Sequence, residues 1–437
     1  MKNFSNLFKG KKVVIMGLGL HGGGVGVANF FIKQKAQVTI TDLKKEKDLK
    51  ESLVKIKQLS KVTLILGRHR KEDFKNADLI VKNPAVPPDS PFLNIAYKNN
   101  IPVKTDIDIF FEICSAPIIG VTGTKGKSTT STLIYLFLKT KFPKTFLAGN
   151  IGVSPLEIVS QIDKNSKVVL ELSSFELESL KKSPHIAVIT SLFPDHLDRY
   201  KNFNNYLKSK ESIFRYQKKS DILILNYGDL RVRKLGQKAN SKIYYFKTDD
   251  LKKENIDFPS WIEPSNIAAA LLVAKIFKVP KKEIKKVLAN FKGIKHRQEL
   301  VAVKKGIYFV NDTAATTPQS VILAIKLSKK RFPGADITLI AGGVDKGLKY
   351  KQLVQKIKKE VANLILLPGS ASEKIRKELG SKFELYLARD MEDAVKKAIK
   401  TSKKGDLIIL SPGAASFNLF RNEFDRGEKF IKIIKKL

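Results

Sequence analysis

Short apolar runs alternate with longer amphipathic stretches along most of the chain. Residues 13–16, 118–121 and 186–190 are continuous runs of apolar or β-branched side chains, each followed by a turn and a helix-like segment. Such runs are typical of strands that are buried on both faces of a parallel sheet. The pattern therefore predicts an α/β protein with mostly parallel sheets.

Two breaks in this alternation predict domain boundaries. A helix-like stretch at 107–112 ends the first part, and Ser115-Ala116-Pro117 precedes a new apolar strand. The second part ends near 293–297, after which two short strands are expected to pair. We predict three α/β domains, at 1–114, 115–297 and 298–437. Strands of the third domain are expected at 300–303, 307–311, 337–341, 364–367, 384–387 and 407–410.

Composition narrows the environment of the protein. The single cysteine, Cys114, excludes an internal disulfide and any metal site built from several cysteines. No apolar run reaches about 18 residues, which is the length that a membrane-spanning helix needs. The first residues also lack the apolar segment of a signal peptide. These features predict a cytoplasmic protein.

The net charge of +39 is large, with 81 lysines and arginines against 42 acidic residues. Such a charge would attract nucleic acid or an anionic membrane. The lysines are nevertheless spread over the whole chain and form no basic stripe interleaved with aromatic residues. This distribution favours a generally lysine-rich surface, which would also speed the encounter with a substrate that carries several phosphates.

A glycine-rich loop at 120–130 is the strongest candidate site. It follows an apolar strand and precedes a helix-like segment at 130–139, which is the context that a phosphate loop needs. Backbone N–H groups and the helix N-terminus would bind phosphate, Lys127 would neutralise its charge, and Ser128 would bind magnesium. Val121 stands where the strict motif has glycine, so this is a variant. The candidate ATP residues here are Gly123, Thr124, Lys125, Gly126, Lys127, Ser128 and Thr129.

A second glycine loop, Gly17-Leu-Gly19-Leu-His-Gly22, follows the first strand. Asp42 ends the next strand, and this spacing matches a dinucleotide fingerprint. The loop would suit the diphosphate of any nucleotide, so an NAD-dependent dehydrogenase remains an alternative. The phosphate loop farther along the chain argues against it.

Two polar side chains follow apolar strands in the middle segment. Glu171 ends a strand at 167–171, where an acid would meet magnesium bound to phosphate. His196 lies in Asp195-His196-Leu-Asp198, after the strand at 186–190. A single histidine is more often structural, but the carboxyl end of a parallel strand is where ligands of such sheets bind.

Three motifs together make the chain resemble the Mur ligases. They are Gly-Thr-Lys-Gly-Lys-Ser-Thr at 123–129, Leu-Glu-Leu-Ser-Ser-Phe-Glu-Leu-Glu at 170–178 and Asp-His-Leu-Asp-Arg-Tyr at 195–200. The second resembles in particular the branch that adds D-glutamate. The resemblance implies a Rossmann-like domain at 1–114 that binds the UDP-linked substrate, a phosphate-loop ATPase domain at 115–297 and a Rossmann-like domain at 298–437 that binds glutamate. The resemblance implies a monomeric, ATP-dependent amide ligase of peptidoglycan synthesis. It implies that UDP-N-acetylmuramoyl-L-alanine is phosphorylated on its carboxylate and then attacked by the amine of glutamate, with two Mg²⁺ ions neutralising phosphate charge.

The resemblance also assigns roles to single residues. Lys210 matches a lysine that is carbamylated in the family. Only a neutral amine reacts with carbon dioxide, and a free amine with a pKa of about 10.4 is almost wholly protonated at neutral pH, so the reaction needs local help. It places one magnesium at Ser128 and Glu171 and the other at His196 and the Lys210 carbamate. It gives ATP contacts to Asn266, Arg297 and Asp312, and substrate contacts to Leu20, His21, Asp42, Asn150, Ser173, Lys346, Ser416 and Phe417.

Some positions depart from the family pattern and keep alternatives open. Lys125 replaces the usual asparagine of the phosphate loop, and Ile262-Glu263 replaces a His-Asn pair near the adenine site. The run at 313–317 lacks the usual lysine, and the aromatic residue at 424 is shifted by one position. Selectivity for D- or L-glutamate therefore stays open. A related Mur or folylpolyglutamate-type ligase, a basic nucleic-acid-binding ATPase and a catalytically silent nucleotide-binding module are the alternative functions.

Overall fold

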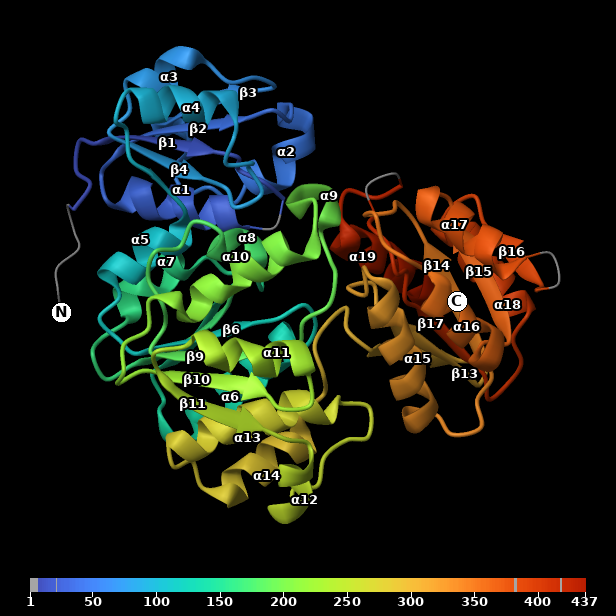
Figure 1. Ribbon diagram of the computed structural model, residues 1–437. Coiled ribbons are helices and arrows are strands. Elements are labelled where there is room, and N and C mark those ends of the chain that lie inside the picture. Colours follow the sequence, from blue (N-terminus) through green and yellow to red (C-terminus); the bar gives the residue numbers. More distant parts are fainter. Residues whose placement is uncertain (1–6, 21, 381–382, 417–418) are drawn as a thin grey trace. The chain divides into compact units, whose positions relative to one another are not determined.

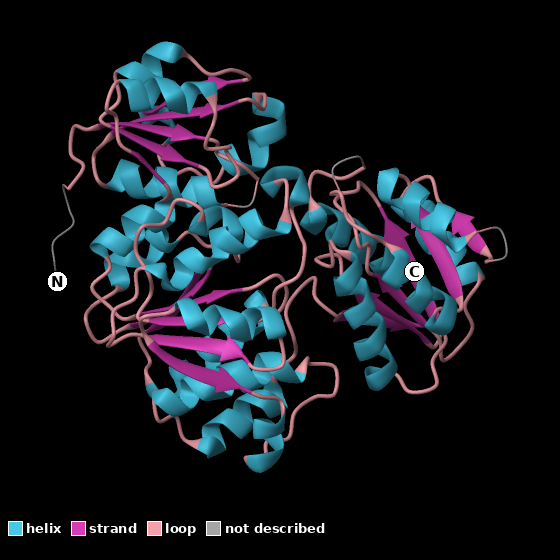
Figure 2. Cartoon of the chain, in the orientation of Figure 1, coloured by secondary structure: helices cyan, strands magenta, loops and turns pink. Residues whose placement is uncertain are grey.

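The computed structural model describes residues 7–20, 22–380, 383–416 and 419–437. Three sheets follow one another along the chain, and each is covered by helices (Figures 1 and 2). The first two sheets are wholly parallel, and the third has one antiparallel edge strand. The predicted α/β class with mostly parallel sheets is confirmed.

The first sheet has five strands in the order β3-β2-β1-β4-β5. The strand order reverses between β1 and β4, and ligands of such sheets bind at the carboxyl ends of the strands at this point. Helix α1 packs on one face of the sheet, and α3 and α4 pack on the other. The elements are β1 (Lys12–Met16), α1 (Gly23–Lys33), β2 (Gln37–Asp42), α2 (Glu46–Leu53), η1 (Leu59–Lys61), β3 (Val62–Leu66), α3 (Lys71–Lys75), β4 (Leu79–Lys82), α4 (Pro91–Lys98), β5 (Val103–Lys104) and α5 (Asp106–Ile113).

The second sheet has six strands in the order β11-β10-β9-β6-β8-β7, all parallel. Its central strand β6 lies between β8 and β9, so the segments that follow these three strands meet at one edge. The elements are β6 (Ile118–Thr122), α6 (Lys127–Lys141), β7 (Thr145–Gly149), α7 (Pro155–Ile158), η2 (Val159–Gln161), β8 (Lys167–Glu171), α8 (Ser174–Leu177), β9 (Ile186–Ile189), α9 (Leu197–Tyr200), α10 (Phe203–Arg215), β10 (Ile222–Asn226), α11 (Leu230–Lys234), η3 (Leu235–Lys238), β11 (Lys242–Phe246), α12 (Asp249–Lys253), α13 (Pro264–Ile276) and α14 (Lys281–Asn290).

The third sheet has the order β12-β13-β17-β14-β15-β16, and only β12 runs antiparallel to its neighbour. One core packs α15, α16 and α17 on one face, and a second core packs α18 and α19 on the other. The elements are β12 (Glu299–Lys304), β13 (Ile307–Asn311), α15 (Pro318–Arg331), β14 (Ile337–Gly342), α16 (Lys351–Glu360), β15 (Asn363–Leu367), α17 (Ser370–Leu379), β16 (Leu385–Leu387), α18 (Met391–Lys400), β17 (Leu407–Leu410) and α19 (Glu423–Lys435).

The chain divides into two compact units. The first contains 1–192, 207–250 and 268–284, and the second contains 193–206, 251–267 and 285–437. Within the first unit, α1 lies so close to α7 that a Cβ added to Gly26 would lie 2.3 Å from Glu157 Oε1. Glycine permits this approach, and it packs the first sheet's helix layer against that of the second.

Candidate functional site

The loop between β6 and α6 has the geometry of a phosphate site. Gly126 has a φ of 90° and caps α6, whose first turn begins at Lys127. The Lys127 amine donates to the carbonyl oxygens of Gly123 and Thr124 at 3.1 and 3.2 Å. A helix N-terminus and a lysine amine thus lie in one loop, an arrangement that favours a bound polyphosphate.

Two hydroxyl residues after β9 fix the shape of this loop. Thr190 Oγ1 donates to the carbonyl of Lys125 at 2.6 Å, and Ser191 Oγ donates to the same oxygen at 3.0 Å. Thr124 N donates in turn to Ser191 O at 2.7 Å. Sequence reasoning missed this role because the two hydroxyls lie about 65 residues from the loop, and only the pairing of β6 with β9 brings them together.

Glu171 ends β8 beside the phosphate loop. It is paired in register with Val121 of β6 and is fully buried. Its Oε1 accepts a hydrogen bond from Asn150 Nδ2 at 3.0 Å, whereas Oε2 finds no hydrogen-bond partner within the described part of the chain. A buried carboxylate oxygen without a donor is costly unless a cation or ligand satisfies it.

This orphaned oxygen fits the predicted magnesium site. Ser128, at the start of α6, is also buried, and its hydroxyl is the predicted second oxygen ligand from the same edge of the sheet. No group of three or more His, Cys, Asp or Glu side chains able to hold a metal occurs among the residues that the structure describes. Magnesium characteristically takes one or two protein oxygens and completes its shell with phosphates and water, so this sparse donor set suits it.

Lys210 lies beneath the phosphate loop. It projects from α10, is 1% exposed, and donates through Nζ to Gly123 O at 3.0 Å and to Thr122 Oγ1 at 3.3 Å. One of many lysines in the sequence is thus buried against the candidate phosphate site. The position agrees with a role near the bound nucleotide, and it stays a prediction that the amine is carbamylated.

The glycine loop after β1 is shaped by Asp42. The Asp42 carboxylate accepts hydrogen bonds from the N–H groups of Leu18 and Gly19 at 2.9 and 3.3 Å, and from Lys44 N at 2.9 Å. Leu20 is half-buried and packs against the neighbouring core. The acid therefore holds the glycine loop in shape.

Asn83, which follows β4, closes the other side of this loop. Its side chain lies 3.0 Å from a Cβ built on Gly17, and its Nδ2 donates to Gly17 O at 3.3 Å. Gly17 has a φ of 91°, so both space and backbone conformation require glycine there. Sequence reasoning did not identify Asn83, because an asparagine before a proline reads as an ordinary turn residue.

Ser173 caps a short helix and touches a buried acid. Its hydroxyl accepts from Glu176 N at 3.2 Å and donates to the Glu176 carboxylate at 2.7 Å. Burial, followed by the nearby charge of Asp106, raises the pKa of Glu176 to about 8, and burial raises the pKa of Asp106 to about 6. The Ser173 hydroxyl therefore caps α8.

In the second unit, Arg297 and Asp312 are brought together by a tight turn. His296 and Gln298, on either side of Arg297, have φ values of 67° and 49°. Gln298 N donates to Asp312 Oδ1 at 3.1 Å, and Ser411 Oγ donates to Asp312 Oδ2 at 2.9 Å. Asn266, which is buried near the start of α13, belongs to the same unit.

A buried ion pair joins the segment after β9 to the third sheet. Lys346 Nζ lies 2.8 Å from Asp195 Oδ1, and both side chains are about nine-tenths buried. Burial acts to raise the pKa of the Asp195 carboxyl, but the charges of Lys346 and His196 outweigh it and the net pKa is lowered. His196 Nε2 is 3.7 Å from Asp195 Oδ2, so Lys346 and His196 share this acid. Sequence reasoning singled out Lys346 and His196 and noted the acid beside His196, but it did not predict that this acid pairs with Lys346.

The structure describes some of the remaining predicted residues but not all of them. Ser416 is buried, and its Oγ has no hydrogen-bond partner in the ranges that the structure covers. His21 and Phe417 lie outside the described residues. Ser128, Glu171 and Lys210 belong to the first unit and His196 to the second, so the four predicted metal ligands are divided between the two.

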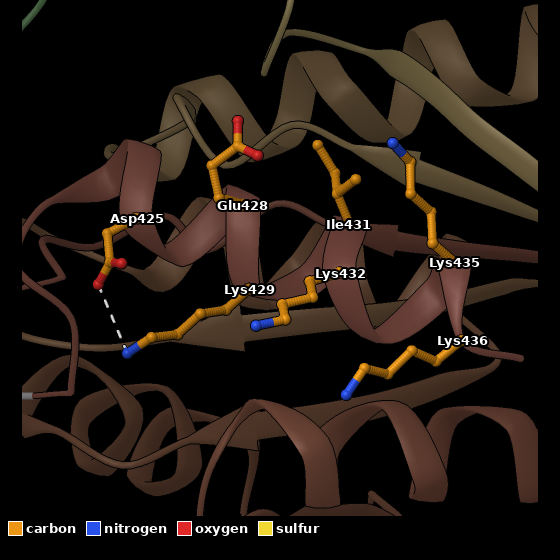
Figure 3. A pocket seen from close by; sticks show the side chains of 7 residues that line it. All are labelled: Asp425, Glu428, Lys429, Ile431, Lys432, Lys435 and Lys436. Carbon is orange, nitrogen blue, oxygen red and sulfur yellow. Dashed lines mark ion pairs between the residues drawn. The ribbon is translucent and has the colours of Figure 1, made fainter.

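A pocket of 590 Å³ lies along α19 and contains none of the predicted residues (Figure 3). Lysines dominate its lining, and Lys429 pairs with Asp425 at 3.5 Å. Other α-helices of this chain are similarly lysine-rich, so the lining alone does not mark a ligand. The residues that line the pocket are Asp425, Glu428, Lys429, Ile431, Lys432, Lys435 and Lys436.

In the described chain, no helix has the length and apolar character needed to cross a bilayer.

Three family profiles match successive parts of the sequence. The Mur ligase MurD-like N-terminal domain matches residues 11–105, and the Mur ligase middle domain matches 121–296. The Mur ligase glutamate ligase domain matches 296–413. Together they cover most of the chain.

Full-length relatives share about a third of the sequence. The UDP-N-acetylmuramoylalanine–D-glutamate ligase of Roseiflexus sp. (strain RS-1) is 38% identical, and the alignment covers 98% of both chains. The protein of the same name from Borreliella burgdorferi (strain ZS7) is also 38% identical over 98% of both. That of Clostridioides difficile (strain 630) is 33% identical over 97% of this chain and 98% of its own.

Solved structures share the fold at lower identity. UDP-N-acetylmuramate-alanine ligase MurC from Thermotoga maritima superposes with a TM-score of 0.65 at 18% identity, covering 98% of this chain and 99% of its own. MurF ligase from the same organism, solved with ADP, gives a TM-score of 0.61 at 19% identity over all of both chains.

Proposed function

Because this chain belongs to the Mur ligase family, we propose that it is a UDP-N-acetylmuramoylalanine–D-glutamate ligase. ATP transfers its γ-phosphoryl group to the alanine carboxylate of UDP-N-acetylmuramoyl-L-alanine. The amine of D-glutamate attacks the acyl-phosphate, and the tetrahedral intermediate collapses to an amide and phosphate. The products are ADP, phosphate and the extended nucleotide. The observation that carries the proposal is the 38% identity to ligases of this name over 98% of both chains.

The phosphate loop is the proposed site of the ATP phosphates. The residues from Gly123 to Thr129 would surround them, with Lys127 leaving its two loop carbonyls to neutralise the phosphate charge. Chemistry of this kind depends on holding the reacting groups in line and on stabilising charge in a dry site. The partly buried hydrogen bonds from Thr190 and Ser191 to the loop support this preorganisation.

We assign one magnesium ion to Ser128 and Glu171, with the Glu171 Oε2 orphan as its ligand. When bound, the ion supplies positive charge that offsets the charge on the phosphates. The resemblance supports a second ion at His196 and a carbamate on Lys210. A carbamylated Lys210 would keep one N–H on Nζ, which can still donate to Gly123 O, while its two carboxylate oxygens would face the ion.

The remaining contacts rest on the family likeness and, for all of them except His21 and Phe417, on the positions described above. Asn266, Arg297 and Asp312 are proposed for adenine, phosphate and ribose, and Lys346, Ser416 and Phe417 for glutamate. Leu20, His21, Asp42, Asn150 and Ser173 are proposed for the nucleotide substrate. We keep the domain boundaries at 114/115 and 297/298 as part of the proposal. We also propose a cytoplasmic monomer, since ATP and a UDP-linked precursor are both substrates of the cell interior.

Phosphate release tests the proposal. Purified protein receives ATP, Mg²⁺ and UDP-N-acetylmuramoyl-L-alanine with D-glutamate, L-glutamate or no amino acid. We expect release that requires both the nucleotide substrate and D-glutamate. Release with L-glutamate alone would keep the chemistry and overturn the assigned selectivity. ATP hydrolysis independent of both substrates, but stimulated by DNA or RNA, would replace the ligase with a nucleic-acid-dependent ATPase.

A further inference from the structure

The turn that carries Arg297 is held in a conformation that needs support. His296 and Gln298 are not glycines, yet both have left-handed backbone angles, with φ values of 67° and 49°. Such residues cost free energy and persist only where their surroundings fix them. The groups that hold this turn therefore decide where Arg297 lies.

Both backbone hydrogen-bonding groups of Gln298 have partners. Its N–H donates to Asp312 Oδ1 at 3.1 Å, and its carbonyl accepts from Arg331 Nη1 at 2.7 Å. The side chain is also held, since Ser328 Oγ lies 3.4 Å from Gln298 Oε1. Arg331 and Ser328 both project from the end of α15, so this helix supports the turn.

Arg331 is itself fixed by an aromatic surface. Its guanidinium carbon lies 4.7 Å from the ring centroid of Trp261, a cation–π contact. Trp261 stacks in turn on Phe291, with centroids 6.1 Å apart and an interplanar angle of 11°. A Cβ built on Gly293 would lie 3.0 Å from the Trp261 ring, so close packing leaves the indole little freedom. Burial also lowers the pKa of Arg331, in accord with a guanidinium withdrawn from water.

The contacts of Arg331 and Trp261 connect two segments that carry residues proposed to bind the nucleotide. Trp261 lies five positions before Asn266, and Ser260 Oγ lies 3.4 Å from Lys330 O. At the other end, the Gln298 peptide bonds directly to Asp312 and follows Arg297. The same set of side chains thus links the segment before α13 to the turn at 296–298.

We propose that Arg331 and Trp261 are positioning residues for the nucleotide, which hold Arg297 and Asp312 in place without touching ATP themselves. The inference rests on the proposed ATP roles of those two residues. Arginine suits the task because its planar, forked group can donate to a carbonyl in the plane while an aromatic ring covers its face. Lysine could offer the charge but not both contacts at once.

Equilibrium binding of Mg-ADP, measured by titration calorimetry, tests the proposal directly. We expect Arg331→Met to raise the Kd about tenfold, since a charge-assisted hydrogen bond and a cation–π contact are both lost. Arg331→Lys should weaken binding nearly as much, whereas Trp261→Phe should weaken it less than Trp261→Leu. Lys330→Met removes a neighbouring exposed charge from the same helix and should leave the Kd within about twofold.

Turnover separates positioning from general damage. In Arg331→Lys, which keeps the charge and is the mildest change, the KM for ATP should rise while the KM values for D-glutamate and the nucleotide substrate stay within about twofold. An unchanged ATP affinity, or an equal loss for all three substrates with a lowered Tm, would overturn the inference. If wild-type protein binds Mg-ADP but makes no amide, the ligase assignment fails while the binding test of Arg331 still stands.

Discussion

At the scale of single residues, Lys210 offers a sharp test of mechanism. Its amine is buried and bonded to Gly123 O and Thr122 Oγ1, so the residue supports the loop as a cation or, once carbamylated, supplies an anion. We expect Lys210→Ala to lower kcat by about 100-fold or more, because a charged group beside the reacting phosphates is lost. Initial rates of phosphate release measure this.

Chemical rescue distinguishes the two forms of Lys210. If a carbamate acts, acetate or formate should restore part of the activity of Lys210→Ala, because each returns a carboxylate to the cavity. If only the amine matters, methylamine should rescue and carboxylates should not. Lys208→Ala on the same helix, at an exposed position, is the matched control and should keep full activity. Undiminished turnover by Lys210→Ala would remove the residue from the mechanism.

Glu176 gives a prediction about stability and pH. Its pKa is raised to about 8, chiefly by burial, so the folded state holds a proton that the unfolded chain releases near its ordinary pKa. Stability should therefore fall as pH rises from about 4.5 to 8, where the unfolded state binds fewer protons than the folded state. Glu176→Gln keeps an acceptor for Ser173 N and should flatten this slope.

Thermal melts at several pH values check the Glu176 prediction. The Tm of Glu176→Gln relative to wild type should increase between pH 5 and pH 8. Glu378→Gln changes an exposed acid and should parallel wild type throughout. Parallel curves for Glu176→Gln and wild type would show that the buried carboxyl is not protonated in the folded protein.

The sequence predicted some site residues and missed others for a physical reason. Lys127 and Glu171 stand in local patterns, a glycine loop and the end of an apolar strand, that carry their own signal. Thr190 and Asp195 act through partners at positions 125 and 346, and nothing in the neighbouring residues marks those contacts. Only the strand order β9-β6-β8 and the packing of the third sheet bring such partners together.

At the scale of elements, the phosphate loop depends on the absence of a side chain at Gly123. A Cβ there would lie 2.0 Å from Thr190 Oγ1, and the φ of 149° is unfavourable for other residues. Gly123→Ala should therefore displace the loop or β9, lowering the Tm by several degrees and the affinity for Mg-ADP about tenfold or more. Melts and calorimetric titration measure the two effects.

A second glycine separates backbone strain from steric conflict. Gly334 has a φ of 82°, but a Cβ built there meets nothing within 4 Å. Gly334→Ala should cost stability through its backbone alone and leave nucleotide affinity unchanged. If the two variants weaken Mg-ADP binding equally, the contact with Thr190 is not what shapes the loop.

Element prediction succeeded where burial leaves a strong pattern. The central strands β6, β9, β14 and β17 are almost wholly apolar and were placed within a residue or two. Edge strand β11, Lys242–Phe246, was not predicted: its residues 243–246 are apolar or aromatic, but four of its five positions are exposed, unlike those of the central strands. Helix α8 has four residues and is defined by the Ser173–Glu176 capping box rather than by periodicity.

At the scale of the whole molecule, the two compact units do not follow the domain boundaries that the sequence predicts. Segments 193–206 and 251–267 follow strands of the second sheet but cluster with the third. The ion pair of Asp195 with Lys346 and the stacking of Arg331 on Trp261 are two contacts that connect these segments to the third sheet's unit. Local composition shows where a strand ends but not which sheet the following loop joins.

Domain closure is the prediction that belongs to this largest scale. The proposed phosphate loop lies in the first unit, whereas the proposed ribose and glutamate residues lie in the second. A ligase must exclude water from an acyl-phosphate, and closure of domains around the substrates is the usual means. We expect the radius of gyration, measured by small-angle X-ray scattering, to fall when Mg-ATP analogue and UDP-N-acetylmuramoyl-L-alanine are both present. The Lys127→Met variant should not contract, because its phosphate site is impaired. Equal radii for the free and fully liganded wild type would mean that the reaction proceeds without this closure.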